Sequence, residues 1–139
     1  MEQRLDYKTA SPAGFQGMLQ LQLAVNKSGL EESLLEPLIC DARAMGESEQ
    51  RLYLLPVWRD AHCYTPRERA ALGWTEAVTK IADVHDVPDS VYAEARKHFD
   101  EKALVDLTMA IIAINGWNRL NVAFRTTVGD YVSPHRSSK

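Results

Sequence analysis

The sequence predicts an all-α fold organised around one long helix near the C-terminus, and three observations support this prediction. No stretch alternates apolar and polar residues as a half-buried β-strand does. Signals that start and stop helices recur along the chain. Residues 107–114 read LTMAIIAI, in which only Thr108 is polar, so two turns of a helix there leave no face for water. We therefore expect a long, buried central helix.

Composition is that of an ordinary globular protein. The 139 residues suit a single domain over 1–139, in which polar residues 1–10 are expected to be extended and flexible and residues 126–139 mobile. The net charge of −3 predicts no basic surface for nucleic acid. The apolar run of eight residues falls well short of the roughly twenty that cross a membrane, so no membrane span is expected.

The N-terminus and the cysteines predict a cytoplasmic protein. The opening residues, MEQRLDYKTA, lack the apolar segment of a secretory signal. In the cytoplasm Cys40 and Cys63 should be reduced. They form no C-x-x-C pair, and no set of histidines and cysteines has the spacing of zinc ligands. We therefore predict neither a metal ion nor another cofactor.

Two helices are predicted before residue 47. Ser11 is an N-cap type and Pro12 suits the first helical position, so a helix starts there and Gly29 closes it in the left-handed conformation. Residues 30–46 look helical at both ends. Pro37 interrupts them with a kink or break, because proline removes a backbone donor and disfavours helix at the residue before it.

Two further helices follow. Residues 48–55 form a short one, which Pro56 stops. The clearest local signal is Thr65-Pro66-Arg67-Glu68, a capping box with proline at the first helical position. The helix that it opens should extend to about Ala82. Its predicted buried stripe is Ala70, Ala71, Trp74, Ala77, Val78 and Ile81.

The last two predicted helices adjoin one another. Pro88 and Asp89 start one that runs to about Phe99, and Asp100 then caps the central helix, which extends to Arg125. Glu101 lies in its first turn, where the positive end of the helix dipole favours a carboxylate. The inward residues predicted for the shorter helix are Val91, Tyr92, Ala95 and Phe99.

Four stretches together resemble the AhpD-like alkylhydroperoxidase branch of the carboxymuconolactone decarboxylase family. They are SLLE at 33–36, DARAMGESEQRLYLLPVWRD at 41–60, YTPRERAALGWTEAVTKI at 64–81, and LTMAIIAINGWNRLNVAFR in the central helix. The resemblance covers most of the chain. It implies an all-helical AhpD-like bundle, a homo-oligomer of three or six chains, and antioxidant thiol peroxidase chemistry with a dithiol electron donor.

That chemistry is implied by a family motif, C-x-x-C-x-x-x-H, which lies between a glutamate and a D-A-R-A sequence. One cysteine attacks the peroxide as a thiolate, and the second resolves the sulfenic acid into a disulfide. The histidine and the glutamate relay the proton. This chain has the glutamate as Glu36, the candidate catalytic residue, and the D-A-R-A as residues 41–44.

The two cysteines and the histidine of this motif are missing here. Only Pro37, Leu38, Ile39 and Cys40 separate Glu36 from Asp41, where the family has about twenty residues. Cys40 matches neither family cysteine, and its neighbouring acids would make it less reactive. Three explanations are open. The segment is genuinely absent, and this chain is a non-catalytic relative of the family; it was deleted or altered in this version of the protein; or it is missing from the sequence alone.

The remaining candidate residues favour structural roles. His62 and Cys63 are adjacent, and adjacent side chains seldom face each other, so packing is favoured over a catalytic dyad. The other histidines have no metal-ligand spacing, and the tryptophans are expected in the core. Polar residues on the central helix need partners, which neighbouring helices or a subunit interface would supply. These residues are His85, His98, His135, Trp74, Trp117, Asn115, Asn118 and Arg119.

Three functions follow from these observations. The first is an alkylhydroperoxidase, whose flanking segments are present but whose cysteine pair is not. The second is a non-catalytic oligomeric relative. The third is a lactone decarboxylase, which needs no cysteine pair but for which no cluster of basic residues is evident. No nucleotide-binding glycine loop or serine nucleophile motif supports another class of enzyme.

Overall fold

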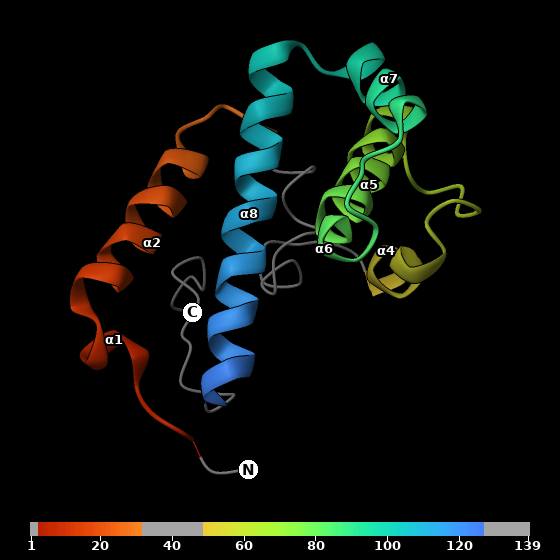
Figure 1. Ribbon diagram of the computed structural model, residues 1–139. Helices are drawn as coiled ribbons and strands as arrows, with labels where there is room; N and C mark the ends of the chain where they lie inside the picture. The colour runs from red at the N-terminus through yellow and green to blue at the C-terminus, as the bar shows by residue number, and fades with distance from the viewer. Residues whose placement is uncertain (1–2, 32–48, 127–139) are drawn as a thin grey trace, which may run out of the picture.

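The computed structural model describes residues 3–31 and 49–126, and every regular element within these two stretches is a helix, which confirms the all-α prediction (Figure 1). The expected helix over 30–46, its kink at Pro37 and the cap at Ser48 fall largely outside these residues. In chain order the elements are α1 (Tyr7–Ala10), α2 (Pro12–Asn26), α4 (Glu49–Leu54), the 3-10 turn η2 (Leu55–Val57), α5 (Pro66–Thr79), α6 (Ile81–Val84), α7 (Asp89–His98) and α8 (Glu101–Phe124).

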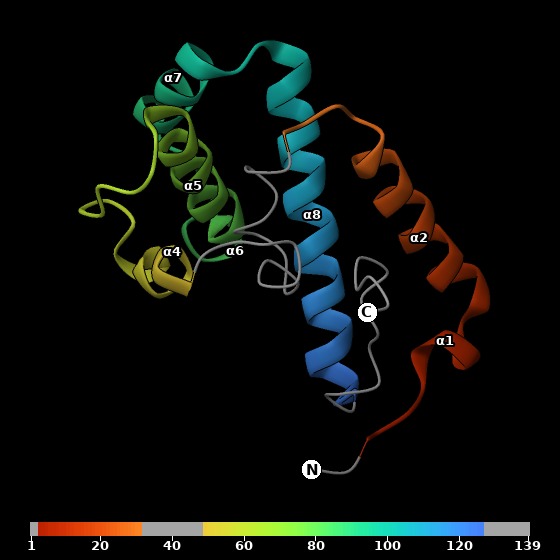
Figure 2. The ribbon, with the colours of Figure 1, turned by 180° about the vertical axis from the view of Figure 1, so that it is seen from behind.

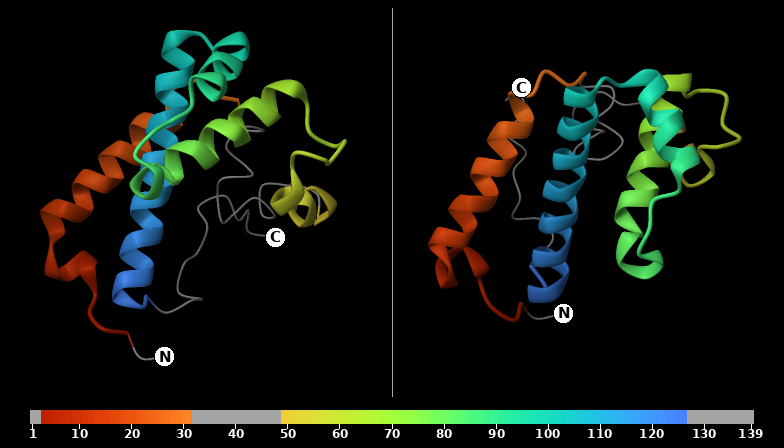
Figure 3. Two further views of the ribbon diagram at one scale, coloured as in Figure 1. Left: turned by 45° about the vertical axis from the view of Figure 1, so that its right-hand side comes forward. Right: turned by 45° about the horizontal axis from the view of Figure 1, so that its top comes forward.

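The central helix is α8, as the sequence predicts. The side chain of Asp100 caps it by accepting a hydrogen bond from the backbone N–H of Ala103 at 2.7 Å, and Arg125 ends it in the left-handed region with φ 51°. Helix α2 lies along one side of α8, and α5 and α7 lie along the other (Figures 1 and 2). Three layers of helices result, which is clearest in the right-hand view of Figure 3.

Complete enclosure of α8 was the wrong expectation. Met109 is 45% exposed and Ile112 is 48% exposed. Both lie in the run predicted to have no face for water. Among the described residues, α2 covers one side of α8 and α5 and α7 cover another, and Met109 and Ile112 lie between these sides.

The two covered sides of α8 differ in the size of their residues. Leu107 and Ile111 are fully buried with Phe99, in a cluster that also holds Ala71 of α5 and Ala95 of α7. On the other side Ala110 and Ala113 meet Val25 of α2. Small residues let α2 approach closely. At Gly116 an added Cβ would lie 2.8 Å from Cε of Met18, so glycine keeps this approach open.

The N-terminal segment contains the short helix α1 and contacts α8, which corrects the expectation of an extended stretch. Asp6 caps the short helix α1, and Tyr7 is buried. The phenol of Tyr7 donates to Oδ1 of Asn121 at 3.1 Å. The backbone N–H of Arg4 donates to the carbonyl of Phe124 at 3.0 Å, and its guanidinium donates to that of Ala123. The last backbone carbonyls of a helix have no N–H partner within the helix. Arg4 supplies donors to two of these carbonyls at the end of α8.

Helix α5 begins at the predicted capping box but ends earlier than predicted. The Thr65 side chain and the Glu68 carboxylate each accept from the other's backbone N–H. The helix stops at Thr79. Lys80 has ψ 1°, which turns the chain, so α6 is separate and Ile81 is 46% exposed instead of buried.

Other boundaries are close to the predicted ones. Gly29 has φ 84° and so adopts the left-handed conformation predicted for the end of the first helix. Pro56 lies inside the 3-10 turn η2, which continues one turn beyond α4. Helix α7 buries Ala95 as expected and is followed by the buried Phe99, but Tyr92 is 48% exposed and was wrongly assigned to the core.

Candidate functional site

The predicted catalytic residue Glu36 and its neighbour Cys40 lie outside the described residues. Their predicted roles therefore stay predictions. His135 also lies outside. What remains is the region that follows the predicted motif, from α4 through the loop at 58–65 to the start of α5, which contains His62 and Cys63.

The loop at 58–65 is held by arginine side chains that bind its backbone carbonyls. Arg69 of α5 donates to the carbonyls of Tyr64 at 3.1 Å, of Arg59 at 2.6 Å, and of Ala61. Arg51 of α4 donates to the carbonyl of Cys63 at 2.8 Å. A loop without regular structure cannot pair its own carbonyls, so two guanidinium groups satisfy them instead.

Arg51 also forms the most buried ion pair within the described residues. Its Nη2 lies 2.7 Å from Oε1 of Glu68, whose side chain is only 10% exposed. The second oxygen of Glu68 accepts from the backbone N–H of Thr65 at 2.7 Å. Burial alone would raise the pKa of Glu68, but the hydrogen bonds from Arg51 and Thr65 and the Arg51 charge outweigh it and hold the pKa below its ordinary value.

This arrangement fixes Glu68 as a carboxylate acceptor. Both of its oxygens are already bound by donors, and its lowered pKa keeps it ionised. A lowered pKa makes Glu68 a weaker base, so it is poorly suited to take a proton from a thiol. The Arg51–Glu68 pair instead ties α4 to the start of α5.

Cys63 occupies the packing position that the sequence favours. Its side chain is half-buried against Ala61, Tyr64 and Leu72, together with residues of α4 and η2. His62 is exposed. Two neighbouring residues with such different surroundings do not form a thiol and base in contact.

The other candidates serve structure. Nε1 of Trp74 donates to Oγ1 of Thr108 at 2.9 Å, which gives the single polar residue of the apolar run its partner. Nε1 of Trp117 donates to Oε1 of Gln22 at 3.3 Å. Nδ2 of Asn115 donates to Thr79 at 3.1 Å, as expected for a polar group that faces a neighbouring helix. Both tryptophans are half-buried and line the core edge.

The histidines of the described chain lie at helix ends or in the loop. His85 ends α6 in the left-handed region with φ 55°. His98 ends α7, with Nε2 3.5 Å from Oε1 of Glu94. No group of three or more metal-binding side chains comes together in residues 3–31 and 49–126, and no helix there is long and apolar enough to cross a membrane.

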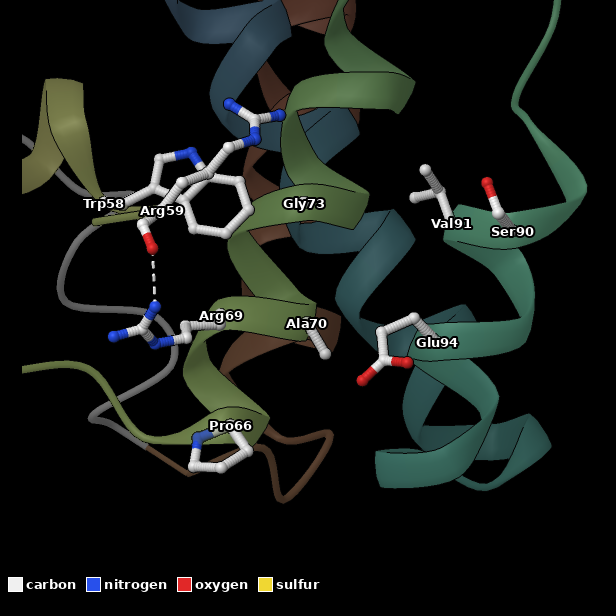
Figure 4. A pocket seen from close by; sticks show the side chains of 9 residues that line it. All are labelled: Trp58, Arg59, Pro66, Arg69, Ala70, Gly73, Ser90, Val91 and Glu94. Atoms are coloured by element: carbon white, nitrogen blue, oxygen red, sulfur yellow. Dashed lines mark hydrogen bonds between the residues drawn. The ribbon is translucent and has the colours of Figure 1, made fainter. Parts of the chain in front are cut away.

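One cleft of about 380 Å³ lies between α5, α7 and the start of the loop (Figure 4). Its floor is formed by Ala70 and Gly73, with the Trp58 ring close to Gly73 and Glu94 on the facing helix. The guanidinium of Arg59 stacks on the Trp58 ring at 4.4 Å and binds Glu76 at 2.9 Å. Arg59, Arg69 and Glu94 of the lining are thus bound to protein partners, and none of the lining residues is a cysteine.

The arginine network was missed from the sequence. Arg51 lies in the DARAMGESEQRL stretch that carries the resemblance, but nothing local indicates that its partner is Glu68, seventeen positions later. The capping box did identify Glu68. The role of Glu68 in capping α5 could therefore be predicted from the sequence, whereas its ion pair with Arg51 of α4 required the three-dimensional structure.

No family model matches the chain. The uncharacterised protein YdfG of Bacillus subtilis is 35% identical over an alignment of 140 positions, gaps included, that covers 88% of this chain and 95% of the relative. A crystal structure from Agrobacterium tumefaciens is 37% identical, covers 91% of this chain and 97% of that one, and superposes with a TM-score of 0.83. That protein is described as one of unknown function and, provisionally, as the antioxidant defence protein AhpD. At this identity and coverage, the chain belongs to the AhpD-like family.

Proposed function

We propose that the protein is an AhpD-like antioxidant-defence protein whose scaffold suits thiol-dependent reduction of alkyl hydroperoxides, and that the chain as written lacks the redox centre and does not catalyse the reaction. The observation that carries the proposal is the cysteine inventory. Cys40 and Cys63 are the two cysteines of the sequence. In a peroxidase of this kind, the peroxide oxidises the first cysteine to a sulfenic acid. A second thiol must then reach that sulfur to form a disulfide.

The structure of Cys63 supports this proposal. It is packed into the loop cluster, and its carbonyl is fixed by Arg51. The Cα atoms of two cysteines in a disulfide lie about 4.4–6.8 Å apart. Arg51 and Arg69 bind backbone carbonyls of residues 58–65, which restricts the movement of Cys63 toward any other thiol.

The alignment with the Bacillus protein also supports a missing segment. It spans 140 positions, yet 88% of a 139-residue chain is about 122 residues. The relative therefore has about 18 residues within the aligned span that this chain does not match. That length agrees with the segment that the family resemblance places between Glu36 and Asp41.

The test is peroxidase turnover. The chain as written is assayed with cumene hydroperoxide and a dithiol donor, and we expect no turnover above the uncatalysed rate. A second version replaces residues 37–40 with the corresponding segment of the Agrobacterium protein, and we expect turnover to appear. The matched control carries the same segment with its cysteines changed to serine.

Two outcomes would contradict the proposal. Turnover by the chain as written that disappears in Cys40→Ser would show that the existing thiol is sufficient. A restored chain that is helical by circular dichroism, contains the segment and remains inactive would show that the scaffold is not a peroxidase scaffold.

A further inference from the structure

The charges of the described chain are divided unevenly between its elements. Residues 3–31 and 107–126, which form α1, α2 and the second half of α8, carry five basic and two acidic side chains, a net charge of +3. Residues 49–106 carry eight basic and eleven acidic side chains, a net charge of −3. The acidic total of the whole chain therefore conceals a basic region.

The N-terminal segment brings its cations to the end of α8. The backbone N–H and the guanidinium of Arg4 both bind carbonyls at the end of that helix. The phenol of Tyr7, the neighbour of Lys8, donates to Asn121 at 3.1 Å. Residues 3–10 and the last turns of α8 thus lie together, at the lower end of the molecule in Figures 1 and 2. We call this region the basic end, and its cations are Arg4, Lys8, Arg119 and Arg125.

Three of these cations have no carboxylate beside them. Lys8, Arg119 and Arg125 are exposed, and none of them forms an ion pair with residues 3–31 or 49–126. The nearby Asp6 carboxylate is used to cap α1, where it accepts from the backbone N–H of Lys8 at 3.0 Å. Elsewhere, three exposed lysines each have a carboxylate oxygen at 2.6 Å: Lys80, Lys97 and Lys102. The basic end therefore presents charge that the described chain does not neutralise.

Exposed apolar side chains lie among these cations. Val122 is 78% exposed, the highest value for a large hydrophobic residue in the described ranges. It is three residues from both Arg119 and Arg125, a spacing that makes side chains neighbours on a helix. Leu5, which follows Arg4, is 41% exposed. Cations combined with exposed apolar side chains suit an anionic lipid surface, because the cations meet phosphates while the apolar groups enter the boundary between headgroups and acyl chains.

We propose that the basic end binds the surface of an anionic phospholipid membrane, with Val122 and Leu5 inserted among the headgroups. Charge complementarity supports this partner, since the membrane supplies the negative groups that the described chain does not. The same surface repels the acidic residues 49–106, so the protein binds in one orientation. Nucleic acid would also attract the cations, but it offers no apolar layer for Val122.

Vesicles test the requirement for negative lipid. The full chain is sedimented with vesicles of phosphatidylcholine alone and with vesicles of equal parts phosphatidylcholine and phosphatidylglycerol. We expect binding to the mixed vesicles only, and less of it as salt is added, because ions screen the attraction. Equal binding to both kinds of vesicle, or none to the mixed vesicles at low salt, would overturn the proposal. Binding is measured without turnover, so the result does not depend on peroxidase chemistry.

Paired substitutions test whether the basic end is responsible. Each basic residue near an anionic surface raises the partition constant roughly fivefold, so the double variant Arg119→Gln/Arg125→Gln should bind the mixed vesicles about 25-fold more weakly. The matched control, Lys80→Gln/Lys97→Gln, removes the same charge from exposed side chains of other elements and should weaken binding less than about twofold. Circular dichroism checks that both variants fold. Equal losses would show that only total charge matters and would overturn the proposal.

A third pair of variants separates a lipid surface from other polyanions. Val122→Ser should weaken binding to the mixed vesicles roughly fivefold, because the valine side chain leaves water when the protein binds. Val84→Ser, at a residue of α6 that is 60% exposed, should keep the parent constant. A short DNA duplex is the comparison probe and should bind more weakly than the vesicles at the same salt. An unchanged constant for Val122→Ser, or equally tight binding of the duplex, would refute the assignment to lipid.

Discussion

Replacing Glu68 with glutamine tests the buried ion pair most directly. Two donors point at the two carboxylate oxygens: Nη2 of Arg51 and the backbone N–H of Thr65, each at 2.7 Å. An amide has the same shape but only one acceptor. Whichever way it is oriented, its NH₂ group faces a donor, and the charge that balances Arg51 is lost.

The size of the effect follows from burial. The side chains of Arg51 and Glu68 are 22% and 10% exposed, so water can replace few of the interactions that the substitution removes. A charge-assisted hydrogen bond contributes about 1.5–3 kcal/mol, and an uncompensated buried charge costs about 3–5 kcal/mol. We expect Glu68→Gln to lower the free energy of unfolding by about 2–4 kcal/mol. For a chain of this length, 3 kcal/mol lowers Tm by roughly 10 °C.

The assay is urea denaturation followed by circular dichroism, with Glu76→Gln as the matched control. Glu76 forms ion pairs with Arg59 and Lys80 at the surface, so its loss should cost less than about 1 kcal/mol. An equal loss of unfolding free energy in both variants would show that the buried ion pair stabilises the fold no more than a surface pair does.

The pH dependence gives a second check. The pKa of Glu68 is lowered from its ordinary value of 4.5, so the unfolded chain binds its proton at higher pH than the folded one does. The advantage of the parent over Glu68→Gln is therefore complete well above pH 4.5, and it decreases as the pH falls through the lower pKa of the folded state. An advantage that grew on acidification would refute this assignment.

Three further substitutions test local features, each by the change in the free energy of unfolding. Thr108→Val leaves the Trp74 indole N–H without its acceptor and should cost about 1–2 kcal/mol, whereas Thr75→Val, whose hydroxyl bonds only to its own helix, should cost less. His85→Gly relieves a left-handed backbone and should stabilise by about 0.5–1 kcal/mol, and a loss would contradict the strain. Tyr7→Phe removes the bond to Asn121 and should cost about 1 kcal/mol; because burial raises the pKa of Tyr7, this difference should shrink above pH 10, where the unfolded chain ionises first.

Local signals predicted where helices begin, and long-range contacts decided the rest. The capping box at Thr65 and the cap at Asp100 are formed by neighbours in sequence, so they could be identified from the sequence. The end of α5 could not, because the apolar pattern continues to Ile81 while a single turn at Lys80 redirects the chain. Helix α1 was missed because its residues are mostly polar, although Asp6 was a readable cap.

The candidate site shows the same division. The motif that flanks the expected redox centre was recognised from residue identities, and the comparisons support the AhpD-like family. Glu36 and Cys40 fall outside the described residues, so their roles stay predictions. Arg51 and Arg69 bind carbonyls that are distant in sequence, and no periodic pattern encodes such pairs.

Helix α8 is covered on two sides by the described helices, and apolar side chains between those sides are exposed. A helix apolar on every side is stable in water only if every side is covered, and within one chain α2 covers one side while α5 and α7 cover the other. Met109 and Ile112 therefore expose apolar surface whose burial would contribute about 1–2 kcal/mol for each side chain.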